Sequence, residues 1–225
     1  MNKLYNIDCM EYMKDIPDKY FDLCITDPPY GIDIANKLGG SLYFAETNKK
    51  DWDKYTPDKN YFKELFRVSQ NQIIFGGHYF VEYLYASMGW IVWDKNNGSS
   101  TFSDGELIYT SFQRALRIFK KTWCGSSSRS REEKVKIHPT QKPIALYKWL
   151  LTNYSKPGFK LLDTHSGSGS FRIAAYDLGF DLDSCELDTD YCQSNEARYQ
   201  NHIKQGDLFK PEEIQKQIYQ KELIK

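Results

Sequence analysis

Two short motifs in this chain carry residue types that could do chemistry together. The first is Asp27-Pro28-Pro29-Tyr30, which joins a carboxylate, two rigid prolines and an aromatic ring. The amino nitrogen of a nucleobase is a poor nucleophile, because its lone pair is delocalised into the ring. An enzyme that uses it must therefore accept hydrogen bonds from both N–H groups in the transition state. Asp27 can supply one acceptor, and the Pro28 carbonyl, held by the fixed proline φ, can supply the other. Tyr30 offers a face on which a flipped-out base could stack.

The second motif, Asp-Thr-His-Ser-Gly-Ser-Gly at 163–169, carries residue types that bring backbone close to a ligand. Gly167 and Gly169 permit positive φ in the turn before a helix. About 19 residues beyond Gly167, an expected strand ends in Glu186. Its carboxylate could accept from both hydroxyls of a ribose, although it could also be a surface charge. A dinucleotide fingerprint would need a third glycine at position 172, where the chain has arginine, so that alternative matches poorly.

Strands alternate with helical stretches along the chain, which predicts a mostly parallel sheet with helices on both faces. Strands are expected at 3–7, 21–26, 72–75, 90–93, 106–111, 115–121, 159–163 and 181–186. Helices are expected at 9–15, 58–70, 79–87, 143–154, 170–178, 188–200 and 211–225. The strands at 106–111 and 115–121 could pair as a hairpin. Each of the two motifs then follows a buried strand.

Together, the two motifs resemble those of S-adenosylmethionine-dependent DNA amino-methyltransferases. Residues 27–30 match the catalytic tetrad of that family completely. The order of the motifs, catalytic before cofactor-binding, resembles the permuted β group. Residues 75–80, 93–95 and 102–106 resemble the family's intermediate motifs and extend the match over roughly residues 4–200. The resemblance implies a circularly permuted, Rossmann-like α/β fold and S-adenosyl-L-methionine as the cofactor.

The resemblance also implies further cofactor-binding residues. The run His-Pro-Thr-Gln-Lys-Pro at 138–143 resembles the segment that precedes a cofactor-binding helix in this group. Thr140 and Lys142 are therefore candidates to bind the methionine carboxylate, with a plain loop-to-helix connector as the alternative. Asp8, just after the first expected strand, is the candidate for the adenine N6 of the cofactor, and Asp207 is its rival.

One departure from the family pattern lies in the cofactor turn. The family's usual run is Asp-Pro-Phe-x-Gly-Ser-Gly, whereas this chain has Thr164 and His165 at the second and third positions. An imidazole therefore replaces the aromatic ring that normally contacts the cofactor. The full set of expected cofactor-binding residues is Asp8, Thr140, Lys142, Asp163, His165, Ser166, Gly167, Gly169 and Glu186.

These features predict a site-specific DNA adenine-N6 methyltransferase that acts on a flipped-out adenine. In the family, an initial Asp in the tetrad usually goes with adenine and an initial Ser with N4-cytosine. An N4-cytosine enzyme remains the nearest alternative, and a catalytically inactive DNA-binding relative is another, given His165. Protein-glutamine and ribosomal RNA enzymes share related tetrads but usually keep the unpermuted order. The DNA target, a restriction partner, and a bacterial or phage source are all left open.

Charge is unevenly distributed along the chain, although the formal net charge is zero. Residues 110–142 hold nine basic side chains against Glu132 and Glu133, so this segment carries +7 and the remainder −7. A basic segment on an acidic body predicts a phosphate-binding footprint on double-stranded DNA, although it could also be a solvated face. The residues expected to bind DNA are Arg129, Arg131, Lys134 and Lys136. The loop at 31–56 is the alternative DNA surface.

The length of 225 residues fits a single methyltransferase domain with a short DNA-recognition insertion around 112–137. So short a recognition region suggests a short or loosely read target, or help from a second subunit, hence a possible homodimer. The chain begins with no signal-peptide pattern and holds no apolar run of about 18 residues, so a cytoplasmic protein with no membrane partner is expected. Its five cysteines lack CxxC spacing and its four histidines lack ligand spacing, so free thiols and no metal are expected.

Overall fold

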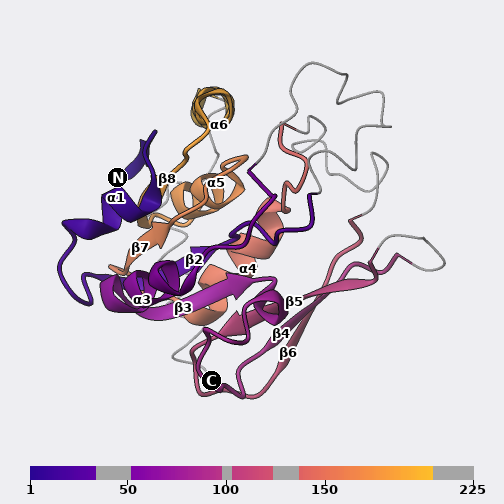
Figure 1. Cartoon of the computed structure of the whole chain (residues 1–225). Coiled ribbons are helices and arrows are strands. Elements are labelled where there is room, and N and C mark those ends of the chain that lie inside the picture. Colours follow the sequence, from indigo (N-terminus) through magenta and orange to yellow (C-terminus); the bar gives the residue numbers. More distant parts are fainter. Residues whose placement is uncertain (34–51, 98–102, 124–136, 205–225) are drawn as a thin grey trace.

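The computed structural model describes residues 1–33, 52–97, 103–123 and 137–204, which contain one eight-stranded sheet (Figure 1). The strands lie in the order β1-β8-β7-β2-β3-β5-β4-β6. Their bounds are β1 (Asn2–Tyr5), β2 (Phe21–Thr26), β3 (Ser69–Phe75), β4 (Ile91–Asp94), β5 (Gly105–Thr110), β6 (Arg117–Lys120), β7 (Lys160–Asp163) and β8 (Asp181–Cys185). All neighbouring strands run parallel except at β5, which is antiparallel to both β3 and β4.

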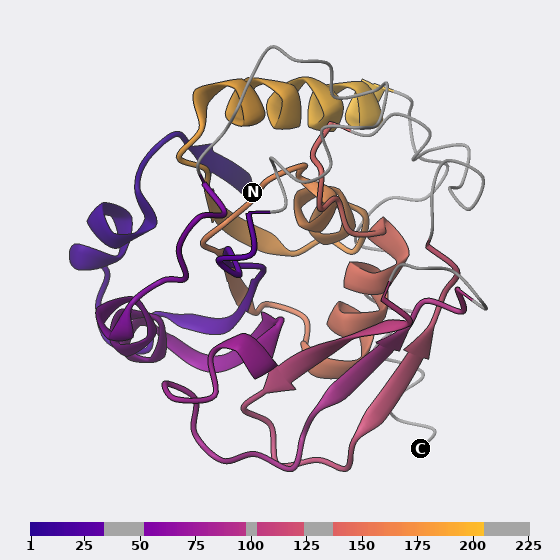
Figure 2. The ribbon, with the colours of Figure 1, turned by 45° about the vertical axis from the view of Figure 1, so that its right-hand side comes forward.

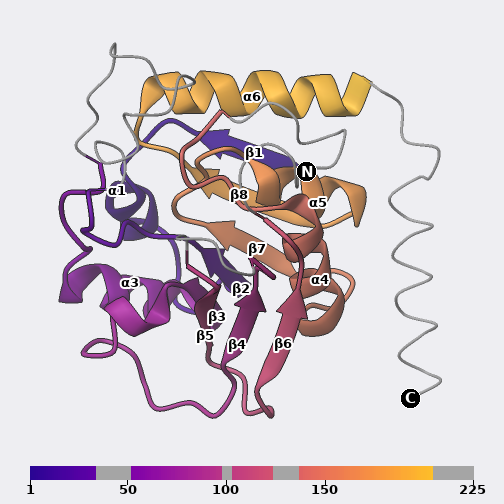
Figure 3. The same ribbon diagram turned by 90° about the vertical axis from the view of Figure 1, so that its right-hand side faces the viewer.

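Helices cover both faces of this sheet (Figure 3). They are α1 (Cys9–Lys14), α3 (Lys59–Val68), α4 (Ile144–Tyr154), α5 (Ser170–Asp177), α6 (Thr189–Lys204) and the short 3-10 helix η1 (Gly77–Tyr79). One hydrophobic core lies between the sheet and α1 and α3, and a second lies between the opposite face and α4 and α5. In the described part of the chain, no helix combines the length and the apolar character that crossing a membrane requires.

Strand β2 explains why these layers form. Leu23 and Ile25 face the core beneath α4 and α5, whereas Cys24 faces the core beneath α1 and α3. All three are fully buried. A strand that is buried on both faces has a nearly continuous apolar sequence, as 21–26 does. Each buried aliphatic side chain contributes about 1.5–3 kcal/mol to stability.

The sheet reverses its winding direction between β2 and β7, which pair in parallel. The chain leaves β2 through α3 and reaches β3 on one side, whereas it leaves β7 through α5 and reaches β8 on the other side. In open α/β sheets, the crevice beyond the carboxyl ends of two such strands is where ligands bind. Both sequence motifs begin at this point, since Asp27 follows β2 and Asp163 ends β7.

Two predictions of local structure are wrong. The expected helix at 79–87 is absent, and η1 is followed by turns. Phe80, Tyr83 and Leu84 still pack in the core beneath α1 and α3, but turns, and not a helix, place them there. Val81 and Tyr85 of this stretch are exposed.

The second error concerns β5 and β6, which were expected to pair as a hairpin. Strand β4 lies between them, antiparallel to β5 and parallel to β6 (Figure 2). Ile91 and Trp93 of β4 are fully buried, which requires a central position, whereas β6 has exposed basic ends that suit an edge strand.

The remaining expected elements occur with ends shifted by a few residues, and β2 has the predicted bounds. The helix expected at 211–225 lies outside the described residues, as do residues 124–136 of the expected insertion. Assignment to the permuted group, and the single-domain organisation, stay predictions.

Candidate active site

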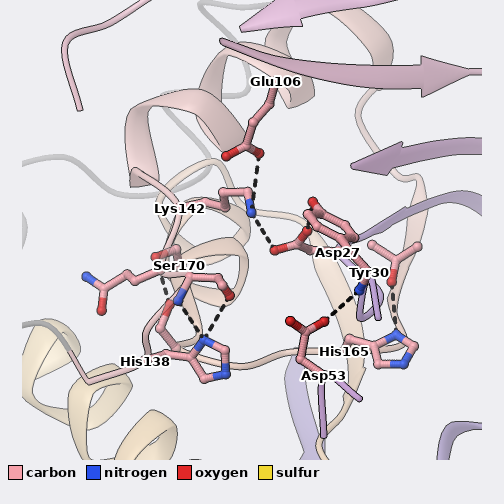
Figure 4. Close-up of polar contacts among 12 residues, drawn as sticks. Asp27, Tyr30, Asp53, Glu106, His138, Lys142, His165 and Ser170 are labelled. Carbon is pink, nitrogen blue, oxygen red and sulfur yellow. Dashed lines mark hydrogen bonds and ion pairs between the residues drawn. The ribbon is translucent and has the colours of Figure 1, made fainter. Parts of the chain in front are cut away.

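The Asp27 carboxylate lies just beyond β2, and each of its oxygens accepts a hydrogen bond (Figure 4). The Tyr30 hydroxyl donates to Oδ1 at 2.5 Å. The Lys142 ammonium donates to Oδ2 at 2.7 Å. Asp27 and Tyr30 thus lie together in one site, and their catalytic roles stay predictions. Lys142 joins them, although it was expected to bind the cofactor.

The backbone after Pro29 is fixed by a residue that sequence reasoning missed. Asp53 is only 2% exposed, and its Oδ1 accepts from the backbone N–H groups of Tyr30 at 2.8 Å and Gly31 at 3.1 Å. Asp53 lies in the aperiodic stretch 31–56, and no motif there marks it. Its effect is to lock the turn that carries Tyr30.

The Tyr30 ring has a defined wall on one side. It stacks on Tyr79 with ring centroids 4.8 Å apart and an interplanar angle of 15°. Gly76 has a φ of +63°, and a Cβ at this position would overlap the Tyr30 ring. Glycine is therefore required both by the left-handed backbone and by the close approach of the ring. Residues 75–80, whose role the sequence did not specify, thus shape the place of Tyr30.

A second carboxylate stands behind Lys142. Glu106 of β5 lies 3.4 Å from the Lys142 ammonium and 2.6 Å from that of Lys95. The four groups therefore form a chain, Asp27–Lys142–Glu106–Lys95, with two negative and two positive charges. Lys95 and Glu106 fall within the runs at 93–95 and 102–106 that resembled family motifs, which was the only signal for them.

Burial and pairing act in opposition on these groups. Burial raises the pKa of Asp27, and the nearby Lys142 opposes that rise. For Glu106, burial would raise the pKa, but Lys142 and Lys95 more than offset it and the pKa is lowered. Burial would lower the pKa of Lys142, but Asp27 and Glu106 hold it above its usual value. Lys142 therefore stays charged across the physiological range.

The departure at residues 164 and 165 has its own hydrogen-bond partners. The Thr164 hydroxyl lies 2.6 Å from that of Thr26 and 2.7 Å from that of Tyr61. It also lies 3.0 Å from Nδ1 of His165, whose ring meets the Tyr61 ring edge-on at 5.4 Å. Burial lowers the pKa of His165 to about 4. The imidazole is therefore neutral at neutral pH.

Asp163, at the end of β7, has a different environment from Asp27. It is 3% exposed, and its Oδ1 accepts from the backbone N–H of His165 at 3.1 Å. Burial raises the pKa of Asp163 well above its usual value. Burial therefore disfavours the charged form of this carboxyl group.

The glycine turn is supported by Glu186. Its Oε2 accepts from the backbone N–H of Gly167 at 2.8 Å, and its Oε1 accepts from that of Asp188 at 2.9 Å. Gly167 and Gly169 both have positive φ, as expected. A Cβ at Gly169 would overlap the amide of Asn195, which sequence reasoning missed.

Asn195 belongs to α6 and also binds the serine of the turn. Its Nδ2 donates to Ser166 Oγ at 2.9 Å and to the Gly167 carbonyl at 3.1 Å. Arg172 in turn donates to Asn195 Oδ1 at 2.8 Å. A buried asparagine in a helix gives no distinct pattern in sequence, so this support could not be foreseen.

Residues 138–143 contact both motifs. The His138 ring would lie 3.7 Å from a Cβ at Gly167, and it packs on Tyr191 and Trp52 with centroids 4.4 and 4.9 Å away. The Thr140 hydroxyl lies 3.1 Å from His138 Nδ1. Lys142 instead reaches Asp27. Trp52 and Tyr191 are additions to the expected site, since neither lies in a motif.

Asp8 caps α1, where its carboxylate accepts from the backbone N–H of Met10 at 2.7 Å. It follows β1, which pairs with β8, so Asp8 and Glu186 come after adjacent strands at the same edge of the sheet. The roles of all nine expected cofactor-binding residues toward a cofactor stay predictions. Asp207, the rival of Asp8, lies outside the described residues.

The expected DNA-binding residues Arg129, Arg131, Lys134 and Lys136 also lie outside the described residues. Four earlier members of the basic segment, Arg114, Arg117, Lys120 and Lys121, lie in the described part of the chain. Arg114 donates to the Asn153 carbonyl at 2.6 Å, and Lys120 lies 3.7 Å from Asp94.

Comparisons with known proteins agree with this geometry. A family model described as DNA methylase matches residues 93–197. The chain is 22% identical over 236 residues to the Type II methyltransferase M2.MboI of Moraxella bovis, covering 87% of this chain and 86% of that protein. It is 24% identical over 246 residues to the Type II methyltransferase M.HinfI of Haemophilus influenzae, covering 88% and 68%.

Solved structures show the same fold. The crystal structure of the M1.HpyAVI–SAM complex superposes with a TM-score of 0.58 at 20% identity, covering 88% of this chain and 98% of that chain. The PvuII DNA methyltransferase, described as cytosine-N4-specific, superposes with a TM-score of 0.59 at 14% identity, covering 97% and 91%. The predicted fold class, a mostly parallel sheet between two helical layers, is thereby confirmed.

Proposed function

We propose that this chain is a site-specific DNA adenine-N6 methyltransferase. Its recognition as an S-adenosylmethionine-dependent DNA amino-methyltransferase is confirmed by the family match and the relatives. The observation that carries the proposal is the position of the two motifs. Asp27 and the turn at 163–169 follow adjacent parallel strands, at the point where the sheet reverses its winding. A methyl donor and an amino acceptor can therefore meet in one crevice.

The cofactor is S-adenosyl-L-methionine, and the residues around the glycine turn suit it. When bound, it supplies an electrophilic methyl group on a sulfonium. Gly167 exposes backbone between Glu186 and His138, which fits a ligand that approaches closely. The buried Nε1 of Trp52, beside His138, has no hydrogen-bond partner among the described residues. A carboxylate of the cofactor would supply the acceptor that this indole lacks.

The remaining chemistry belongs to residues 27–30. Asp27 accepts from one N–H of the target amino group, and the Pro28 carbonyl accepts from the other. These bonds localise the lone pair on nitrogen and strengthen as positive charge develops there. Asp27 can also take the proton that nitrogen loses as it gains a methyl group. The Tyr30 hydroxyl already donates to Oδ1, which keeps a further lone pair to accept from the amino group.

Adenine is the proposed target because the tetrad begins with Asp27. The nearest alternative is cytosine N4, the specificity that the name of the PvuII enzyme gives for that protein. An inactive DNA-binding relative is the third reading, which the Asp27–Tyr30 and Asp27–Lys142 bonds disfavour, since they describe an assembled site.

Nucleoside analysis of treated DNA separates these readings. Unmethylated double-stranded DNA is incubated with enzyme and S-adenosylmethionine, digested, and analysed by mass spectrometry. We expect N6-methyladenine, and we expect none with the Asp27→Ala variant as a matched control. N4-methylcytosine would change the target base, and no methylated base would support the inactive relative.

For DNA docking, we propose that the basic residues Arg129, Arg131, Lys134 and Lys136 bind phosphates. Neutralising all four should flatten the slope of log affinity against log salt by about 0.9 per lost contact, while cofactor affinity stays unchanged. An unchanged slope would point to the loop at 31–56. We further propose that the chain forms a single domain whose insertion around 112–137 recognises DNA. We also propose that it forms a homodimer, and sedimentation can test this oligomeric state.

A further inference from the structure

Lys142 makes contacts that differ from those expected of a cofactor ligand. Its side chain is 5% exposed, and its ammonium lies between two carboxylates, 2.7 Å from Asp27 and 3.4 Å from Glu106. Glu106 is held in turn by Lys95 at 2.6 Å. Figure 4 shows Glu106, Lys142 and Asp27 in line, with Lys142 pointing away from His138.

These contacts join three distant parts of the chain. Asp27 follows β2, Lys142 precedes α4, and Glu106 belongs to β5, next to β4 and Lys95. The ammonium group of Lys142 therefore links Glu106, in the antiparallel part of the sheet, to the Asp27 carboxylate. Desolvation of so buried an ion pair is costly, so the pair is not expected to add to the stability of the fold.

We propose that Lys142 is a positioning residue for methyl transfer: its ammonium holds the Asp27 carboxylate charged and oriented toward the target amino group, and Glu106, backed by Lys95, fixes that ammonium. The inference rests on the proposed function, in which Asp27 accepts from the amino group. It replaces the expectation that Lys142 binds the methionine carboxylate of the cofactor.

The physical reason is the burial of Asp27. Burial favours the protonated acid, which cannot accept from both an amino group and Lys142 as a carboxylate does. Lys142 opposes this effect, whereas Glu106 reinforces it. Among the described residues, the other titratable groups that interact with Asp27 are Tyr30, Asp163 on β7 and Tyr147 on α4. Among these groups only Lys142 brings a positive charge to Asp27.

The two neighbours of Asp27 should therefore shift its titration in opposite directions. We expect Lys142→Met to move the acidic limb of kcat/KM to higher pH by about 1–3 units, since an adjacent cation shifts an acid by that amount. Glu106→Gln should move the same limb to lower pH. Lys142→Arg, which keeps the charge, should restore most of the wild-type profile.

The experiment measures kcat/KM for DNA at saturating cofactor between pH 5 and 9.5, with calorimetry of cofactor binding for each variant. Lys148→Met is the matched control, because it removes a lysine on α4 that pairs with the buried Asp177 at 2.6 Å, away from Asp27. It should leave the acidic limb in place. If Lys142→Met does not fold, Glu106→Gln and Lys142→Arg still test the two predicted profiles.

The outcomes separate this inference from the proposed function. A wild-type protein that methylates no DNA would overturn the proposed function. If the wild type is active, and Lys142→Met and Glu106→Gln both keep the wild-type acidic limb, only the positioning role is overturned. The same holds for a Lys142→Met variant that keeps the wild-type limb but loses cofactor affinity, since Lys142 would then bind the cofactor.

Discussion

Asp27 and Asp163 occupy equivalent places in the sheet, and burial raises the pKa of both, but their hydrogen-bond partners differ. Each comes at the carboxyl end of one of two paired parallel strands, β2 and β7. Asp27 accepts from the ammonium of Lys142 and the hydroxyl of Tyr30. The described contacts of the Asp163 carboxylate include the backbone N–H of His165 and no ammonium group.

The difference shows how one residue type serves two purposes at neighbouring positions. A carboxylate that must accept hydrogen bonds from a substrate needs a nearby cation, because burial alone would protonate it. A carboxyl group that only supports a turn can remain neutral. The sequence shows two strand-final aspartates, whereas the function of each depends on what the rest of the chain brings to it.

The largest effect should follow from removing Asp27, the member of the pair that accepts from an ammonium group. Asp27→Ala should abolish methylation, with about 2.7–4 kcal/mol or more lost from transition-state stabilisation, while cofactor affinity is largely kept. Single-turnover rates and calorimetry measure the two quantities. If Asp27→Ala turned over at near the wild-type rate, Asp27 could not be the acceptor.

The next effect concerns the turn that Asp163 supports. The pKa of His165 is lowered to about 4 in the folded protein, against about 6.5 when unfolded. The unfolded state therefore binds more protons between pH 6.5 and 4, and stability is lost as pH falls through this window. The loss should approach about 3 kcal/mol, since each unit is worth about 1.4 kcal/mol.

His165→Phe removes this titration. The free energy of unfolding of the variant should therefore fall less than that of the wild type as the pH falls from 6.5 to 4. Urea unfolding at several pH values measures it, and the slope with pH matters more than the absolute stability. Parallel slopes for the two proteins would show that His165 is not held neutral.

A smaller effect is expected at the far side of the glycine turn. Glu186→Ala should weaken cofactor binding, with roughly 1.5–3 kcal/mol at stake for each charge-assisted bond to a ribose hydroxyl. The variant also loses the acceptor for the Gly167 N–H, so Glu186→Gln, which keeps one carbonyl oxygen, is the matched comparison. Unchanged affinity in calorimetry would place the ribose elsewhere.

Local patterns in the sequence were sufficient for much of the fold. Strand β2 has the bounds that its apolar run predicts, and α4 begins directly after Pro143. The expected hairpin failed because strand pairing depends on burial over the whole sheet: β4 is more deeply buried than β6 and lies between its neighbours. Periodicity within a strand carries no information on strand order.

For the site, the sequence identified the chemical groups but not their partners. Asp27 and Tyr30 are brought together as predicted, since they lie three residues apart. Asp53, which locks the same turn, and Glu106, which backs Lys142, are distant in sequence and belong to no pattern that indicates pairing. Lys142 was named for its motif, and only the fold shows that it reaches Asp27.

The smallest expected effect comes from replacing Asp163 with asparagine, which cannot ionise. Asp163→Asn keeps the shape and the acceptor oxygen for the His165 N–H, so methylation should stay close to the wild-type rate. The folded-state pKa of Asp163 is raised, so its contribution to stability is full below about pH 3.9 and is lost as pH rises through the folded pKa. At pH 8 the variant should therefore be as stable as wild type or more stable, with any loss below about 1.5 kcal/mol, the net value of one hydrogen bond.

Asp27→Asn is the matched substitution at the neighbouring strand end, and it should lose most of the activity. Urea unfolding and methylation rates for the two variants test the comparison directly: equal losses of activity would mean that Asp163 also acts as a charged group, and that the electrostatic difference between the two strand ends is not what distinguishes them.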